Sequence, residues 1–218
     1  IVDIMTDLQD KAKLLIDGKE IDLNVYTGVE GERAVDVSSL FSQHHLTTYD
    51  PSLGSTAICR SSITYIDGER GVLRYRGVPI EQFDRPNPNF IEVAWMLIFG
   101  RLPDEEELAQ FRDLLTGNEL LHEGLRHQFQ SLPLDAPPMA VLSSMINVMA
   151  CYHKEFLVLE NEQSLMAAAA RLISKVRTIA AFTHRRAQGL PFIYPDPNLR
   201  YCANFLHMMF SLPYKQYD

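Results

Sequence analysis

Hydrophobic and polar residues alternate along the first third of the chain, which is typical of β-strands. Residues 12–16 are followed by Asp17-Gly18 and then by apolar side chains at every second position over 21–25. Asp-Gly between two apolar runs is a strong hairpin signal, because glycine accepts the positive φ of a type I′ turn. Residues 62–76 repeat this pattern around Asp67-Gly68. The pattern therefore predicts two hairpins in a β-rich region over residues 1–88.

From about residue 89 the apolar spacing changes to the 3.6-residue period of helices. Pro103 and the acids at 104–107 favour a helix start, because proline suits the first turn and acids suit the positive end of the helix dipole. Thr116 and Glu119 have the spacing of a capping box. They predict that another helix begins there.

Prolines and glycine separate the remaining helices. Residues 139–152 follow two prolines and are apolar nearly all round, which predicts a buried central helix. The longest helix is expected over 162–188, because Gly189 and Pro191 are typical of a helix end. Asp196-Pro197 is expected to open the last helix. Its apolar face consists of Tyr201, Phe205, Met208 and Met209.

The longest predicted helix carries an apolar seam with alternating spacings of four and three residues: Leu165, Ala169, Leu172, Val176, Ile179 and Thr183. The alanine run 167–170 would let another backbone approach closely. The seam predicts a partner helix, either internal or from another subunit. Together the patterns predict a mainly α fold, with a small β-hairpin-rich region, 1–88, followed by a helical region, 89–218.

Charge and composition narrow the possible functions. The 218 residues carry 20 Lys and Arg against 28 Asp and Glu, a formal net charge of −8. This balance argues against nucleic acid or an anionic membrane as the main partner, and no apolar run is long enough to span a bilayer. Three widely separated cysteines favour reduced thiols, with neither disulfide nor metal site. A cytoplasmic protein with small-molecule or protein partners is expected.

Candidate catalytic side chains are sparse. A surface or structural role is favoured for each of the seven histidines, because none lies in a recognisable catalytic motif. One basic group is more informative. Arg171 and Lys175 are four residues apart on the same face of the longest helix, and Arg177, Arg185 and Arg186 follow. Such a pair could hold a phosphate or a carboxylate, and a solvated face or a subunit-contact salt bridge is the alternative.

The stretch SITYIDGERGVLRYRGVPIE, residues 62–81, resembles a characteristic run of the citrate synthases. Shorter segments similar to later parts of that family follow in the same order, over 138–141, 152–153, 170–175, 189–195 and 204–210. The β-rich N-terminal region is similar to that of the larger, hexamer-forming type II enzymes of Gram-negative bacteria. The resemblance implies the N-terminal portion of such an enzyme, with part of its all-helical large domain truncated at residue 218.

Citrate synthases condense acetyl-CoA with oxaloacetate to give citrate and CoA in the tricarboxylic acid cycle. The resemblance therefore implies an acyltransferase whose acyl group becomes an alkyl group on transfer. The family's catalytic histidines and aspartate follow the region seen here, so no residue of this chain is assigned a catalytic role. No metal or covalently bound cofactor is implied, and the chain alone is expected to be inactive. A 2-methylcitrate synthase fragment and a non-catalytic helical oligomerisation or anion-binding module are the alternatives.

The resemblance also implies an allosteric nucleotide site. Inhibited members of the bacterial type bind NADH away from the active site, and Tyr152, Arg171 and Lys175 match residues of that pocket. Residues 117–120 replace an Arg-His-Thr-Met stretch of those members, and Tyr214 replaces a cysteine. These changes remove a cation and add the acidic Glu119 in that stretch, which disfavours a dianionic pyrophosphate. Weak or absent NADH regulation is expected, in an enzyme that self-associates as a dimer or hexamer.

Overall fold

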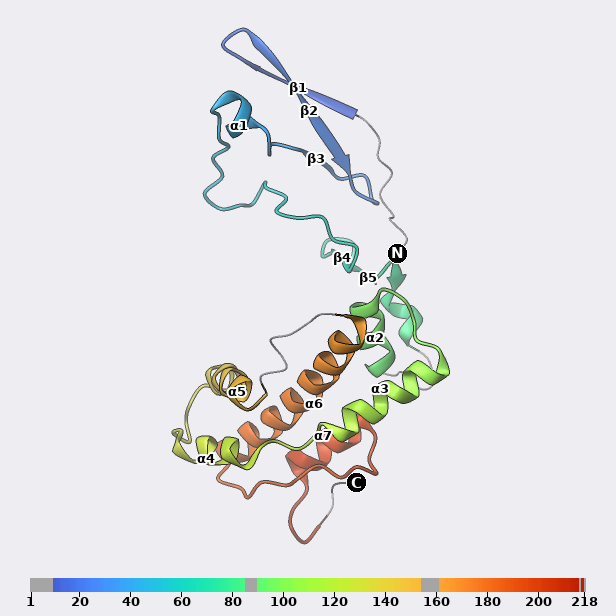
Figure 1. The fold of residues 1–218 in the computed structure, drawn as a ribbon, viewed down its shortest axis with the longest axis vertical. Helices are drawn as coiled ribbons and strands as arrows, with labels where there is room; N and C mark the ends of the chain where they lie inside the picture. The colour runs from blue at the N-terminus through green and yellow to red at the C-terminus, as the bar shows by residue number, and fades with distance from the viewer. Residues whose placement is uncertain (1–9, 85–89, 154–160, 216, 218) are drawn as a thin grey trace. The chain divides into compact units, whose positions relative to one another are not determined.

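The computed structural model describes residues 10–84, 90–153, 161–215 and 217. The chain divides into two compact units, one formed by Ile1–Pro88 with Met96–Arg101 and the other by Asn89–Trp95 with Leu102–Asp218. Over the described residues the chain forms two small antiparallel sheets and seven α-helices. Figure 1 shows the course of the chain through them. The prediction of helices that follow a hairpin-rich N-terminal region is confirmed.

The first unit contains both predicted hairpins. Asp17 and Gly18 have φ values of 51° and 75°, and Ile16 pairs with Lys19 across them, as a type I′ turn requires. In the second hairpin Asp67 pairs with Val72. The first sheet has the order β1-β2-β3 and the second β4-β5-β6. The elements are β1 (Asp10–Ile16), β2 (Lys19–Thr27), β3 (Arg33–Val35), α1 (Leu40–His44), β4 (Thr64–Asp67), β5 (Val72–Tyr75), β6 (Val78–Pro79) and the 3₁₀ turn η1 (Ile80–Phe83).

A small core holds the first sheet. Ile21 and Leu23 of β2 are buried on one face together with Leu40 of α1. Leu14 and Leu46 pack against them. The alternating pattern of β2 therefore has one buried and one exposed face, as the period of two predicts.

The remaining helices are α2 (Phe90–Phe99), which is divided between the two units, α3 (Glu105–Gly117), α4 (Glu123–Ser131), α5 (Pro138–Tyr152), α6 (Glu162–Ala187) and α7 (Tyr201–Phe210). The predicted helix start near Pro103 is confirmed, because Asp104 and Glu107 form a reciprocal capping box at α3. Pro103 itself precedes the N-cap Asp104, so its predicted place in the first turn is wrong. The predicted start at Thr116 is wrong. Thr116 lies in the last turn of α3, and α4 begins later with His122 as its N-cap. Glu119 cannot cap there, because its carboxylate is bound by Arg177.

Helix α5 has almost the predicted bounds but not the predicted burial. Val141, Met145 and Met149, at spacings of four, are buried in the core of the second unit. Met139, in contrast, is 72% exposed, so the prediction of a fully buried helix is wrong for this chain. The physical reason is that, among the described residues, α4 and α6 pack against the face of α5 that carries Val141, Met145 and Met149. The core residues are Leu125, Phe129, Val141, Met145, Met149, Ile179 and Phe182.

Helix α6 confirms the predicted long helix. Asn161 caps its start through a reciprocal bond with Ser164, and Gly189 follows its end with a φ of 67°. Its predicted partner helices are internal, since α6 packs against α3, α5 and α7, as Figure 1 shows. The predicted seam is only partly correct. Ile179 and Thr183 are buried, whereas Leu165 and Leu172 are 38% and 41% exposed.

The start of α7 also differs from the prediction. Arg200, not Asp196, is its N-cap residue. The carboxylate of Asp196 instead accepts hydrogen bonds from the backbone and side chain of Asn198 at 2.9 Å each, which lower the pKa of Asp196. The side chain that was expected to open the helix is thus held in a turn, four residues before the N-cap Arg200.

Candidate functional site

Residues 118–122, here called the α3–α4 connection, are fastened to α6 by side-chain donors. Arg171 Nε donates to Asn118 Oδ1 at 3.1 Å, and Lys175 Nζ donates to the carbonyl oxygen of Leu120 at 2.6 Å. Thr178 Oγ1 donates to the carbonyl oxygen of Glu119 at 2.8 Å. The α3–α4 connection has no regular structure of its own, so Lys175 and Thr178 satisfy two backbone carbonyl oxygens that a helix would otherwise satisfy. Arg171 binds the side-chain amide oxygen of Asn118.

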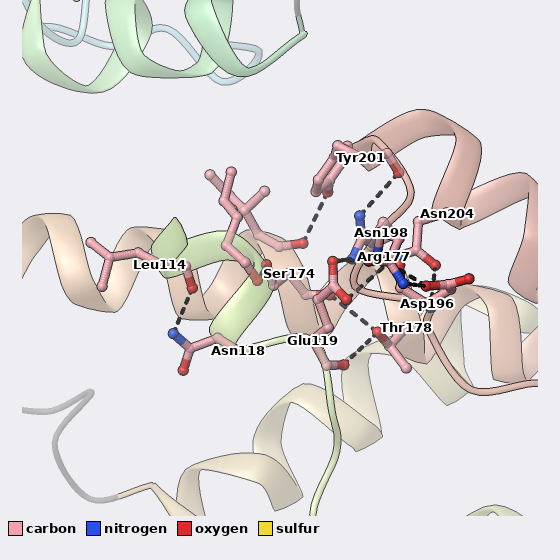
Figure 2. Close-up of polar contacts among 12 residues, drawn as sticks. Leu114, Asn118, Glu119, Ser174, Arg177, Thr178, Asp196, Asn198, Tyr201 and Asn204 are labelled. Carbon is pink, nitrogen blue, oxygen red and sulfur yellow. Dashed lines mark hydrogen bonds and ion pairs between the residues drawn. The ribbon is translucent and has the colours of Figure 1, made fainter. Parts of the chain in front are cut away.

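A buried ion pair lies at the centre of this arrangement (Figure 2). Arg177 Nη2 of α6 is 2.7 Å from Glu119 Oε1, and both side chains are almost completely buried. Asn204 Nδ2 of α7 donates to both carboxylate oxygens of Glu119, at 3.2 Å each. Glu119 therefore joins the α3–α4 connection to α6 and α7 at once. A charge buried to this degree needs such partners, because desolvation of an unpaired carboxylate is costly.

Tyr201 covers the Arg177 side of the pair. The Arg177 guanidinium lies 4.2 Å from the centroid of the Tyr201 ring, and Nη1 donates to the carbonyl oxygen of Tyr201 at 3.0 Å. The Tyr201 hydroxyl donates to the carbonyl oxygen of Ile173 at 3.1 Å. Burial raises the pKa of Tyr201 to about 12. Tyr201 is thus a neutral hydrogen-bond donor at physiological pH.

Tyr152 lies at the other end of the α3–α4 connection. Its ring stacks on the ring of His122 with centroids 4.3 Å apart, while His122 Nδ1 accepts from the backbone N–H of Gly124 at 2.9 Å. A Cβ atom at Gly124 would overlap the Tyr152 hydroxyl oxygen, so the Tyr152 ring could keep this position only against glycine. The three predicted nucleotide-site residues therefore contact one segment, Arg171 at 118, Lys175 at 120 and Tyr152 at 122.

The last two arginines of α6 bind the ends of neighbouring helices. Arg186 donates to carbonyl oxygens at the C-terminal end of α4, and Arg185 donates to those of Met209 and Ser211 at the end of α7. Arg185 Nε also donates to the carbonyl oxygen of Pro191. Arg185 is fully buried, and this burial lowers the pKa of its guanidinium. Cations at these positions also complement the negative ends of the helix dipoles.

The solvated-face alternative is wrong for Lys175, Arg177 and Arg185, which are buried, whereas Arg171 and Arg186 are half-buried. Sequence reasoning missed Glu119 and Asn204 as parts of the same cluster. One signal was available: Ser174, Thr178 and Arg185 lie at spacings of four and seven, so they share one face of α6. A polar stripe on the face that packs against other helices predicts partners for each of its members.

No described helix is long and apolar enough to cross a membrane. Among the described residues there is no group of three or more His, Cys, Asp or Glu side chains that could hold a metal ion.

The chain is similar to known proteins of one family. Residues 52–218 match the family described as citrate synthase, C-terminal domain. The chain is 40% identical to citrate synthase 1 of Mycobacterium tuberculosis over 214 residues, and 39% identical to the citrate synthase of Corynebacterium glutamicum over 216 residues. These alignments cover 98% and 99% of this chain and 49% of each relative.

A solved structure agrees with the sequence matches. The crystal structure of citrate synthase from Pyrobaculum aerophilum is similar with a TM-score of 0.65 and 27% identity, over 86% of this chain and 44% of that one. The chain thus spans about half the length of the curated relatives it matches. Because the family match extends over most of its length, the chain belongs to the citrate synthase family.

Proposed function

We propose that this chain is the N-terminal half of a citrate synthase, which condenses acetyl-CoA with oxaloacetate and releases citrate and CoA. The observation that carries the proposal is the 40% identity to citrate synthase 1 of Mycobacterium tuberculosis along 98% of the chain. We also propose that the enzyme is of the bacterial type II and self-associates. The hairpin-rich segment that precedes the helices supports that subtype.

The role of the described residues in this enzyme is structural. Helices α3–α7 supply part of the helical domain, and the buried donors of α6 fix the α3–α4 connection and the end of α7. The groups that remove the methyl proton of the thioester and protonate the oxaloacetate carbonyl belong to the other half of the enzyme. The 218 residues alone therefore have no condensation activity.

The test is release of CoA thiol from acetyl-CoA with oxaloacetate, measured for the longest product of the gene and for the 218-residue chain. Turnover by the longer product and none by the chain is expected. A higher kcat/KM with propionyl-CoA would assign the enzyme to the 2-methylcitrate synthases instead. No turnover by the longer product would favour a non-catalytic oligomerisation or anion-binding module.

We further propose that NADH binds weakly or not at all at Tyr152, Arg171 and Lys175. Lys175 is only 4% exposed and its ammonium already donates to Leu120, so a phosphate would have to displace that contact. The added acid, Glu119, is already neutralised by Arg177, so the cost of displacing Lys175 replaces charge repulsion as the main obstacle. Titration of NADH fluorescence with the longest gene product tests this, and a micromolar Kd would contradict it.

We propose a cytoplasmic location because the three cysteines are free thiols. Cys59, Cys151 and Cys202 are all exposed free thiols. Such thiols persist in a reducing compartment.

A further inference from the structure

Arg177 and Asn204 donate hydrogen bonds to the Glu119 carboxylate, and contacts with other residues hold both donors in position. Arg177 is held by the carbonyl oxygen of Tyr201 and by the Tyr201 ring. Asn204 is held by Asp196, whose backbone N–H donates to Asn204 Oδ1 at 3.0 Å and whose carbonyl oxygen accepts from Nδ2 at 2.9 Å. Both donors would therefore stay in place if the carboxylate were removed.

The α3–α4 connection is likewise anchored without the Glu119 carboxylate. Its backbone is bound at the carbonyl oxygens of Glu119 and Leu120, by Thr178 and Lys175 respectively. Asn118 Nδ2 in addition donates to the carbonyl oxygen of Leu114 at 2.7 Å, as Figure 2 shows. Shortening the Glu119 side chain should leave a space of defined shape between fixed walls, and not a collapsed loop.

One nitrogen of this set has no hydrogen-bond partner in the described part of the chain. Arg177 Nε is buried and makes no hydrogen bond to the described residues. Nε and Nη2 lie on one edge of a guanidinium, the edge that binds both oxygens of a carboxylate in bidentate pairs. Glu119, tethered to its backbone, uses Nη2 only. A carboxylate free of that tether could engage both nitrogens together with Asn204.

From these observations we infer that Arg177 and Asn204 form a preorganised binding site for a small carboxylate, which the chain fills with its own Glu119. The ligand class is a monocarboxylate of two carbons, because the Glu119 side chain beyond Cβ has the same heavy atoms as acetate. The site lies between α6, α7 and the α3–α4 connection. It is independent of the condensation activity, and its ligand contains neither phosphate nor nucleotide.

The experiment tests whether acetate restores the thermal stability of the Glu119→Ala variant, made in the longest product of the gene. The variant should unfold at a lower temperature than the parent, because Arg177 is left buried without its counter-ion. Acetate should then raise its Tm in a saturable way. A Kd of about 10 mM would give a rise of about 5–9 °C at 0.5 M acetate. Potassium chloride of equal ionic strength should give a much smaller rise, since chloride cannot bridge the two donors.

Two matched variants separate site binding from general effects of salt. Glu119→Gln keeps the space filled, and Glu119→Ala combined with Arg177→Met removes the cation, so neither should respond to acetate more than to chloride. A specific acetate response in either variant, or an equal response of Glu119→Ala to both salts, would overturn the inference. If Glu119→Ala does not fold in buffer, it is refolded from urea into acetate or chloride. Recovery of helical circular dichroism in acetate alone supports the site, and recovery in neither salt contradicts it.

Discussion

Several polar side chains in the second half of α6 are more deeply buried than the two leucines, Leu165 and Leu172, in its first half. Around residues 165–172 the helix is mostly apolar, yet Leu165 and Leu172 are exposed. Over 174–185 it contains Ser, Lys, Arg and Thr side chains and is mostly buried. Neighbouring elements, and not hydrophobicity alone, therefore determine which side chains of α6 are buried. The α3–α4 connection and the end of α7 present carbonyl oxygens and a carboxylate, so side chains that donate hydrogen bonds fit against them.

The largest loss of stability is expected when a donor in the buried half of α6 is removed. Arg185→Met keeps the approximate length of the side chain but leaves the carbonyl oxygens of Pro191, Met209 and Ser211 without their donor. Since a buried polar group without a partner costs about 1–3 kcal/mol, the free energy of unfolding should fall by at least about 3 kcal/mol. Urea unfolding followed by circular dichroism measures the change.

Arg186→Met is the matched control, because Arg186 also donates to three carbonyl oxygens but is less buried. Water can replace part of its hydrogen bonding, so the loss should be about 1 kcal/mol. If Arg185→Met unfolded at the same urea concentration as the parent chain, the buried donors would not be what holds this half of α6.

A smaller effect is expected at the middle of α6, where the Tyr201 hydroxyl donates to Ile173. Burial raises the pKa of Tyr201 to about 12, whereas an unfolded tyrosine titrates near 10. The stabilisation is therefore complete below about pH 10 and is lost as the pH rises towards 12. Tyr201→Phe cannot ionise and should lack this loss, at a cost of about 1 kcal/mol at neutral pH for the missing hydrogen bond.

Urea unfolding of both proteins at several pH values between 8 and 11.5 provides the measurement. The quantity of interest is the difference between the parent and Tyr201→Phe, because other tyrosines of the chain titrate in the same range. A constant difference across this range would mean that the hydroxyl is not desolvated in the folded chain.

The same contrast explains which features the sequence could predict. The first hairpin and the ends of α6 depend on residues next to each other in the chain, such as Asp17-Gly18 and Gly189. The Glu119–Arg177 pair joins residues 58 positions apart, and neither residue carries a local signal for the other. The apparent capping box at Thr116 failed for this reason, since a buried guanidinium competes successfully for the Glu119 carboxylate.

Burial of the apolar seam could not be predicted either. Spacings of four and three identify a face of a helix, but the pattern does not say which length of that face a neighbour covers. Helices α3, α5 and α7 pack against α6, and Ile179 is buried where Leu172 is not. Hydrophobicity along α6 therefore predicted the existence of partner helices and not their extent.

The smallest change in stability is predicted for the exposed half of α6. Leu172→Gln replaces an apolar side chain that is 41% exposed by a polar one of similar size, so the free energy of unfolding should change by less than about 0.5 kcal/mol. Ile179→Ala, seven residues further on the same seam, is the matched control. Ile179 is fully buried in the core, and its truncation should cost about 2–5 kcal/mol.

Urea unfolding at two protein concentrations measures both variants. A Leu172→Gln loss near that of Ile179→Ala would contradict the exposure of this half of α6. If that loss also grew with protein concentration, Leu172 would be covered in solution by a second copy of the chain, because stability gained by association depends on concentration.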